Sequence, residues 1–398
     1  MRLAGLRVKK LTTDSLIRVI LCLYFVISIF EPYLNGILGS ITKYYMFFVM
    51  LVLLWRDGFV LKLRRLCWPY IIWLVFLFVS LLWTENYYIF RLHFISQIGM
   101  VLYMVILLSS RRDEKTLESI IDVYWLSSLI MGLLSVFFSS AYHGTVDSRQ
   151  ILVIMNVEVD PNNQAALLLI GIAISAVNIL YLRRKVWISV AGLLINVYSC
   201  FITSSRAALV AVVAVGLFCV LYSHEKIRFN SVFMRLATIG IAVCVVYVIT
   251  VNFLPEAGFD RLFDFSTYKG GSDRNILWGK AWKVFSEDLL TVLMGAGWGT
   301  YYAYLRKAVH NTFLAMLCDV GLLGTLLFVV PIIIIALRLL KRKEPMPVLL
   351  LGAEFIPAFF IDSINKRFFW NAILILFMYY FIDSRHSSDE GKGTDLSC

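Results

Sequence analysis

Three polar motifs in the sequence each stand directly before a long apolar stretch: Asp160-Pro161-Asn162-Asn163, Ser204-Ser205-Arg206 and His310-Asn311-Thr312. Asp, Ser and Asn are preferred helix N-caps and Pro suits the first helical position, so each motif predicts a helix start. The free backbone N–H groups and the positive dipole of a helix start bind phosphate. The motifs therefore predict an anion-binding site that Arg206 and His310 strengthen. Ordinary capping with an interfacial Arg is the alternative interpretation.

Arg206 and His310 are the two residues of these motifs that could carry chemistry. Arg206 is nearly alone between two apolar stretches, and its guanidinium could hold two diphosphate oxygens at once. His310 joins the polar segment 254–307 to a helix start. Its imidazole could take a proton from a sugar hydroxyl or, as a cation, hold a phosphate. A helix start disfavours the protonated imidazole, which favours the base role.

A glycine-rich motif, Gly295-Ala296-Gly297-Trp298-Gly299, ends the polar segment. No strand pattern precedes it and no Lys-Ser/Thr pair follows it, which excludes a nucleotide-binding loop. We predict a tight turn here. The aromatic residues around it are Trp298, Tyr301, Tyr302 and Tyr304. They could stack on sugar rings or lie in the aromatic belt at the membrane surface.

Acidic residues are rare in the apolar stretches: Asp122, Asp319, Glu354 and Asp362. They could form a proton relay, and Asp362 stands four residues before Lys366, with which it could pair. The polar segments contain no carboxylate cluster at metal-ligand spacing, so we predict neither a metal site nor a cofactor. The seven Cys residues are scattered without a C-x-x-C pair, which indicates neither a disulfide framework nor a zinc site.

The composition indicates the bilayer as the environment of these motifs. Hydrophobic residues make up 60% of the 398 residues and charged residues 16%, whereas soluble domains have about 45–50% and about 25%. The net charge of +11 would suggest nucleic-acid binding in a soluble chain. In a membrane protein it is explained by basic cytoplasmic loops, so we predict no nucleic-acid partner.

The apolar stretches predict twelve spanning helices, because each span needs roughly 20 apolar residues. The predicted spans are 14–31, 38–55, 68–84, 92–110, 117–139, 162–181, 186–203, 205–222, 233–253, 311–337, 347–363 and 367–383. We therefore predict an all-α polytopic membrane protein. Residues 1–383 form a single transmembrane domain, 254–307 a long extracytoplasmic loop with short helices, and 384–398 a disordered cytoplasmic tail. No small-residue cleavage site follows the first stretch, so we expect it to be retained rather than removed as a signal peptide.

The distribution of basic residues predicts the orientation. With the N-terminus inside, 24 of the 37 Lys and Arg residues fall on the cytoplasmic side and the short outer connections are nearly free of them. The positive-inside rule therefore places both termini in the cytoplasm and the three motifs at the outer surface. In the long loop, residues 275–287 have helical spacing of apolar side chains, which predicts an amphipathic helix on the outer surface.

Four motifs resemble the bacterial O-antigen ligase/polymerase superfamily over roughly residues 155–335. They are DPNNQAALLL at 160–169, SSRAALVA at 204–211, GAGWGTYYAY at 295–304 and HNTFLAMLCDVGLLGTLLF at 310–328. The resemblance implies a GT-C-like glycosyltransferase architecture in the bacterial cytoplasmic (inner) membrane. It also implies a metal-independent enzyme that takes a glycan from undecaprenyl diphosphate on the outer face of that membrane.

The resemblance also implies roles for particular residues. Members of the superfamily use an Arg at the Ser-Arg motif and a second Arg in the long loop to hold the diphosphate, with the motif His beside them. Arg206 and His310 match, and Arg274 in GSDRNILW matches better than its competitor Arg261. We expect these three to be catalytic. The expected substrate-binding set adds four residues to them: Asp160, Ser205, Tyr301 and Asn311.

The sequence leaves two activities open, polymerase and ligase, which differ in the molecule that accepts the glycan. A polymerase transfers to another lipid-linked glycan, and a ligase transfers to lipid A core or another envelope acceptor. The turn 364–370 resembles that of surface-polysaccharide polymerases, which favours a polymerase, with a flippase and a chain-length regulator as further expected partners. A twelve-helix transporter or flippase is the alternative of a different class, although such proteins commonly show paired repeats and broken helices at midplane.

The predicted orientation can be tested by labelling. A cysteine introduced within 254–307 should react with a membrane-impermeant reagent added outside the cell, whereas one introduced in the tail 384–398 should not. Labelling of intact and permeabilised cells makes the comparison. The reverse pattern would overturn the orientation and the outer-surface site with it.

Overall fold

The computed structural model describes residues 12–61, 63–110, 113–143, 149–222, 274–305 and 307–390. Its longer helices are α1 (Thr13–Ile29), α3 (Ile41–Arg56), α4 (Trp68–Val79), α5 (Tyr87–Ser109), α6 (Glu114–Phe138), α7 (Pro161–Val177), α8 (Val186–Ile202), α9 (Arg206–Leu221), α15 (Thr312–Lys341), α16 (Pro345–Ala358) and α17 (Arg367–Glu390). Shorter ones are α2 (Glu31–Leu38), α12 (Arg274–Phe285), α13 (Leu289–Met294) and α14 (Thr300–Leu305), with the 3-10 helices Arg65–Cys67 and Ser80–Leu82 and the π-helix Asn178–Leu182.

A helix lies at eleven of the twelve predicted spans. The ninth, 233–253, lies outside the described residues. Within the described ranges, five helices are long and apolar enough to cross a membrane, or six if α1 and α2, which meet at 85°, form one span. Four more apolar helices are shorter. The structure therefore shows a mostly helical chain with several apolar spans, while the number twelve and the GT-C-like architecture stay predictions.

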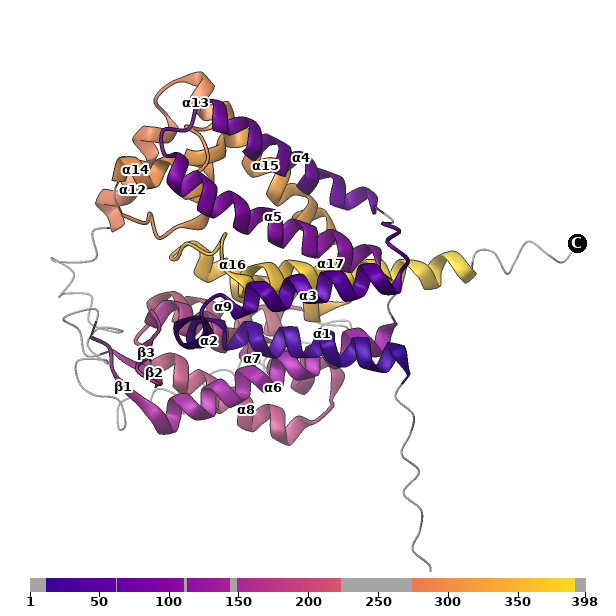
Figure 1. Cartoon of the computed structure of the whole chain (residues 1–398). Coiled ribbons are helices and arrows are strands. Elements are labelled where there is room, and N and C mark those ends of the chain that lie inside the picture. Colours follow the sequence, from indigo (N-terminus) through magenta and orange to yellow (C-terminus); the bar gives the residue numbers. More distant parts are fainter. Residues whose placement is uncertain are drawn as a thin grey trace, which may run out of the picture.

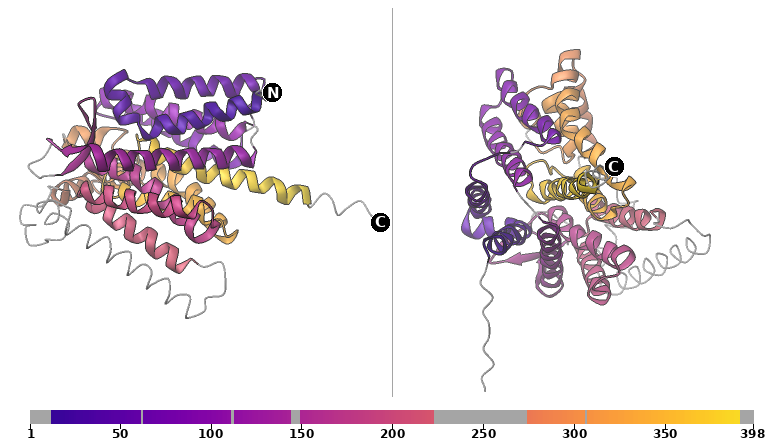
Figure 2. Two further views of the ribbon diagram at one scale, coloured as in Figure 1. Left: turned by 90° about the horizontal axis from the view of Figure 1, so that it is seen from below. Right: turned by 90° about the vertical axis from the view of Figure 1, so that its right-hand side faces the viewer.

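The long helices run roughly side by side, and the elements at their two ends differ (Figures 1 and 2). Strands β1–β3 and helices α12–α14 gather at one end, whereas α1 begins and α17 ends at the opposite end. The segments that the sequence predicts outside thus share one end of the bundle. The two motif helices α7 and α9 also begin at that end.

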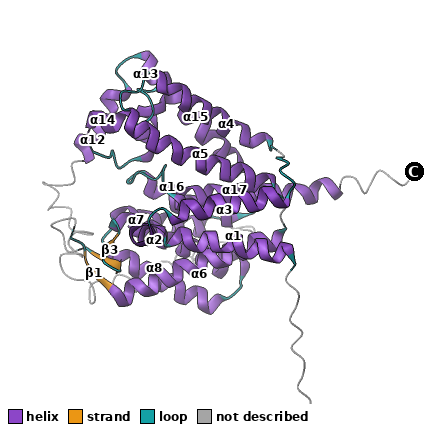
Figure 3. Cartoon of the chain, in the orientation of Figure 1, coloured by secondary structure: helices purple, strands orange, loops and turns teal. Residues whose placement is uncertain are grey.

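A small antiparallel sheet departs from the all-α prediction (Figure 3). Its strands are β1 (Ser139–Ala141), β2 (Gln150–Ile154) and β3 (Val157–Glu158), in the order β1-β2-β3. The pair Ile154–Val157 flanks a two-residue turn of Met155 and Asn156, both with positive φ. Such turns match the twist of a hairpin, and the β-branched residues of β2 suit a half-buried strand.

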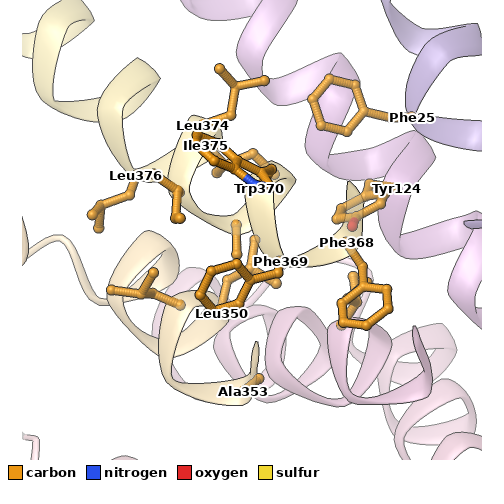
Figure 4. Packing of buried hydrophobic residues seen from close by; sticks show 14 of the residues in the cluster. Phe25, Tyr124, Leu350, Ala353, Phe368, Phe369, Trp370, Leu374, Ile375 and Leu376 are labelled. Carbon is orange, nitrogen blue, oxygen red and sulfur yellow. The ribbon is translucent and has the colours of Figure 1, made fainter. Parts of the chain in front are cut away.

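Helix α17 lies at the centre of the apolar core. Its residues 368–378, apart from the buried Asn371, are buried hydrophobic side chains on every face, as expected for a helix that neighbours surround completely. Figure 4 shows Phe369 and Trp370 among side chains of α1, α6 and α16. Phe328 of α15 adds a close edge-on ring contact with Trp370. This core packs against α15 and α16, whose adjoining connections carry His310 and Asp362.

A kink in α15 anchors the glycine motif. Gly321 has φ 61° and ψ −166°, which interrupts the helix. The carbonyls of Cys318 and Asp319 then accept hydrogen bonds from Ala296 N–H (2.7 Å) and Gly297 N–H (3.0 Å). Gly295, Gly297 and Gly299 all have positive φ, so the predicted tight turn is confirmed.

The Asp319 carboxylate completes this anchor. It accepts hydrogen bonds from the backbone N–H groups of Gly299 (2.8 Å) and Tyr301 (3.0 Å). The turn is also bonded to Thr84, whose hydroxyl donates to the Trp298 carbonyl at 3.1 Å. Asp319 therefore holds the long loop onto α15, a structural role that the sequence-based relay hypothesis did not include.

The kink predicts a site-specific stability effect. Gly321→Ala should destabilise the fold by about 1–3 kcal/mol, because its φ/ψ region is essentially restricted to glycine, and the added Cβ would lie 2.5 Å from the Leu293 carbonyl carbon. Gly352→Ala is the matched control, since a Cβ there meets nothing within 4 Å and Ala favours a helix. Thermal unfolding in detergent should show a lower Tm for the first variant only. Equal Tm values would contradict the proposed anchor.

Candidate active site at the loop end of the bundle

The starts of α7 and α9 are capped as predicted and are joined to each other. Asp160 accepts from the backbone N–H groups of Asn162 (2.9 Å) and Asn163 (3.2 Å). Ser205 accepts from Ala208 N–H at 3.4 Å and donates its hydroxyl to Asn162 Oδ1 at 2.9 Å. The two helix N-termini therefore meet through one amide side chain, which places Arg206 beside the start of α7.

Arg149 is a third member of this junction that sequence reasoning missed. It precedes β2, and only 5% of the residue is exposed. Its guanidinium donates to Asn162 Oδ1 (3.2 Å) and to the Ser204 carbonyl (3.4 Å). Its Nε has no hydrogen-bond partner among the residues that the structure describes. The available signal was an Arg in an outer segment otherwise poor in basic residues.

The pKa of Arg149 responds to both arginines that the sequence predicts in the site. Burial lowers the pKa of the Arg149 guanidinium, Asp160 opposes this shift, and the positive charges of Arg274 and Arg206 add to it. Both arginines therefore lie within electrostatic reach of Arg149, although they come from different segments. Arg206, at the start of α9, and Arg274, at the start of α12, are each half-buried. The competing candidate Arg261 lies outside the described residues.

His310 lies at the start of α15 in a left-handed backbone conformation, with φ 53°. Its side chain is exposed. The next residue, Asn311, is the N-cap, and its Oδ1 accepts from Phe313 N–H (3.1 Å) and Leu314 N–H (3.0 Å). The cap is as predicted.

Asp362 lies beside His310 in the connection between α16 and α17. Its Oδ2 accepts from the His310 backbone N–H at 3.4 Å. Burial raises the pKa of Asp362, while the charge of His310, the N–H groups of His310 and Asn311, and the charge of Lys366 oppose that rise. Lys366, four residues after Asp362, therefore does lower the pKa of Asp362 as the predicted pairing implies, but its influence is the weakest of these. The main neighbour of Asp362 is His310, far away in the sequence.

Tyr301 lies in α14 next to the same group. Only 6% of the residue is exposed. Burial raises the pKa of its hydroxyl well above the usual value, and the charges of Asp362 and Asp319 act in the same direction. Its ring belongs to a small buried cluster, and it contacts the ring of Tyr302. A direct contact between Tyr301 and substrate stays a prediction.

Helix α12 connects Arg274 to the His310 turn. A helix is present where the amphipathic helix was predicted, and it buries Leu277, Ala281 and Phe285. Its apolar pattern holds only in part, because Ile276 and Trp282 are exposed. The Cys318 thiol of α15 donates to the Ala281 carbonyl. Across the described ranges, no three His, Cys, Asp or Glu side chains lie close enough to hold a metal ion. The charged groups at this end are thus mainly guanidinium, imidazole and single carboxyl groups.

The raised pKa of Asp362 predicts a pH-dependent stability. A carboxyl whose pKa is higher in the folded than in the unfolded chain destabilises the fold as the pH rises above the unfolded value. Asp362→Asn should therefore have a higher Tm than the wild type at pH 8, and the difference should vanish near about pH 4. Glu287→Gln, which changes an exposed carboxyl, should show no such difference. A wild-type protein that is the more stable of the two at pH 8 would contradict burial as the dominant influence.

Comparison with known proteins matches residues 191–329 to the family model described as O-antigen ligase. No curated protein matches the chain. The matched segment runs from α8 into α15. It includes six of the seven predicted site residues: Ser205, Arg206, Arg274, Tyr301, His310 and Asn311. It leaves out Arg149, Asp160 and Asp362, which the structure brings to the same end of the bundle. Over residues 191–329 the chain is therefore similar to the O-antigen ligase family, in agreement with the superfamily resemblance of the sequence motifs.

Proposed function

We propose that this chain is a glycosyltransferase that takes a glycan from undecaprenyl diphosphate at the outer face of the bacterial cytoplasmic membrane. The observation that carries the proposal is that Arg206 and Arg274, from different segments, both act electrostatically on the buried Arg149 at the joined starts of α7 and α9. Three like charges repel one another, and a diphosphate offers the counter-charge that relieves this repulsion. Two helix N-termini add backbone N–H groups and positive dipole ends.

The three arginines differ in how far they are buried, and we assign them different roles accordingly. Arg206 and Arg274 are half-buried, so they are the groups that would contact the diphosphate oxygens, each with two parallel hydrogen bonds. Arg149 is buried and bonded to Asn162 and the Ser204 carbonyl. Arg149 would not contact the diphosphate itself. It would orient the Ser204–Arg206 turn and add positive potential at the site. Asp160, Ser205 and Asn311 would act through the helix starts that they cap.

The transfer step requires one bond to break and one to form. The bond between the sugar anomeric carbon and the diphosphate oxygen breaks, and the diphosphate leaves with the bonding electrons. The acceptor hydroxyl oxygen bonds to that carbon from the opposite face, which inverts its configuration. The guanidinium groups and helix N–H groups stabilise the leaving charge, so neither a general acid nor a metal ion is needed in this proposal.

His310 is the proposed base for the acceptor proton. Its side chain is exposed at the start of α15, and an imidazole titrates near neutral pH. Asp362 accepts the His310 backbone N–H, and its negative charge would stabilise the imidazolium formed by proton transfer. The proton thus moves from the acceptor hydroxyl to the His310 imidazole while the glycan moves to the acceptor.

We propose a lipid-linked glycan as the acceptor, which makes the chain a polysaccharide polymerase that works with a flippase and a chain-length regulator. An O-antigen ligase would use the same donor site with lipid A core or another envelope acceptor. The matched family model carries the ligase description, so both acceptors belong in the test. The products differ: a polymerase lengthens the lipid-linked glycan, whereas a ligase moves it to a second acceptor.

Purified protein with lipid-linked glycan and excess chelator tests the proposal. We expect release of undecaprenyl diphosphate and longer glycan chains. Arg206→Lys and Arg274→Lys keep the charge but lose the two-pronged geometry, and each should lower the rate about 10²-fold or more. His310→Ala should lower it about 10²–10⁴-fold.

Arg91→Lys is the matched control, because Arg91 is exposed on α5 and has no place in the proposed site. It should retain wild-type activity. Glycan movement across a membrane without bond formation would favour transport instead. Activity that disappears with chelator and returns with magnesium would overturn the metal-independent mechanism, and near-normal turnover of His310→Ala would remove His310 from catalysis.

A further inference from the structure

Trp278 makes a partly buried hydrogen bond that the proposed chemistry does not use. It lies one turn after Arg274 in α12, and its indole N–H donates to the Val309 carbonyl at 3.0 Å. Val309 is fully buried and directly precedes His310. A buried carbonyl that loses its donor costs free energy, so this bond attaches α12 to the turn that carries His310.

The bonded carbonyl belongs to the same peptide unit as the His310 N–H. A peptide unit is planar and rotates as a whole. Trp278 holds its carbonyl end, and Asp362 accepts from its N–H end at 3.4 Å. The unit leads into a residue with φ 53°, a conformation that non-glycine residues adopt only at a cost. Two partners on opposite edges therefore determine the direction in which the backbone enters His310.

The Trp278 ring also reaches the segment that carries Asp362. Its centroid lies 6.4 Å from that of Phe360, two residues before Asp362. Around it, Ala281 and Phe285 of α12 pack in one small apolar cluster with Val309 and with Ala315 of α15. One side chain of α12 thus contacts both the His310 turn and the Asp362 connection, from a helix that begins at Arg274.

We propose that Trp278 is a positioning residue that fixes Arg274 relative to His310 and Asp362. This inference rests on the proposed function, in which Arg274 holds the leaving diphosphate and His310 takes the acceptor proton. Those two groups must act on opposite sides of one anomeric carbon, so their relative placement decides the rate of the chemical step more than the affinity for the donor. Trp278 sets that placement before either substrate binds.

Trp278→Phe removes the indole N–H and keeps an aromatic ring. We expect kcat to fall roughly tenfold or more, with a much smaller change in KM for the lipid-linked donor. Trp282→Phe is the matched control, because Trp282 lies one turn further along α12 and is 55% exposed. It should keep the wild-type kcat, and both variants should have similar Tm values.

A double-mutant cycle separates positioning from general destabilisation. Trp278 and Asp362 hold the two ends of one peptide unit, so the losses in Trp278→Phe and Asp362→Asn should not multiply in the double variant. Fully multiplicative losses, or a kcat of Trp278→Phe equal to that of Trp282→Phe, would overturn the inference.

Hydrogen exchange gives a readout that does not depend on activity. In the full chain, peptides covering 307–311 should exchange faster in Trp278→Phe than in the wild type or in Trp282→Phe, because the peptide unit has lost one partner. Unchanged exchange would show that the bond does not hold the turn and would overturn the inference. A wild-type chain that transfers no glycan would instead contradict the proposed function.

Discussion

The repulsion among Arg149, Arg206 and Arg274 is the constraint on which the proposed site of this molecule depends. Burial and the two neighbouring positive charges all disfavour the charged form of Arg149, and Asp160 only partly opposes them. Arginine nevertheless stays protonated in proteins, so three positive charges act within electrostatic reach of one another here. A field of this kind at two helix starts is suited to an anion that arrives from the membrane.

Two sets of contacts hold the elements that carry these arginines in place. On one side, Asn162 accepts from both Arg149 and Ser205, which joins α7 to α9. On the other side, the loop helices are attached to α15 by two separate devices. The Gly321 kink exposes carbonyls that bind the glycine turn, and Trp278 bonds to the carbonyl before His310. The proposed phosphate-binding and proton-accepting groups thus lie on separate elements, and hydrogen bonds within the chain hold these elements in place.

Local signals allowed much of this structure to be predicted from the sequence. Apolar length located the helices, and the capping residues Asp160, Ser205 and Asn311 marked three starts that the structure confirms. Residues that act over long sequence separations were not predictable in this way. Arg149 acquires its role only when β2 brings it to Ser204, and Asp362 acquires its role only when the end of α16 reaches His310. Neither contact leaves a periodic pattern in the chain.

The small sheet and the role of Asp319 were missed for a similar reason. Helical patterns dominate the neighbouring segments, whereas β2 is only five residues long, and a short apolar run does not distinguish strand from helix. The sequence analysis interpreted Asp319 as an acidic residue within a membrane span. Its partners, Gly299 and Tyr301, could not be predicted because they lie in the loop that folds back onto α15.

The central claim is that the arginine cluster recognises a diphosphate, and equilibrium binding of two lipids to the purified chain tests it most directly. Undecaprenyl diphosphate and undecaprenyl phosphate share the tail and differ by one phosphate. Without acceptor, the diphosphate should bind at least about tenfold more tightly, a difference of about 1.4 kcal/mol, and Arg206→Gln combined with Arg274→Gln should abolish that preference. Equal affinities in the wild type, or a preference that persists in the double variant, would contradict the account.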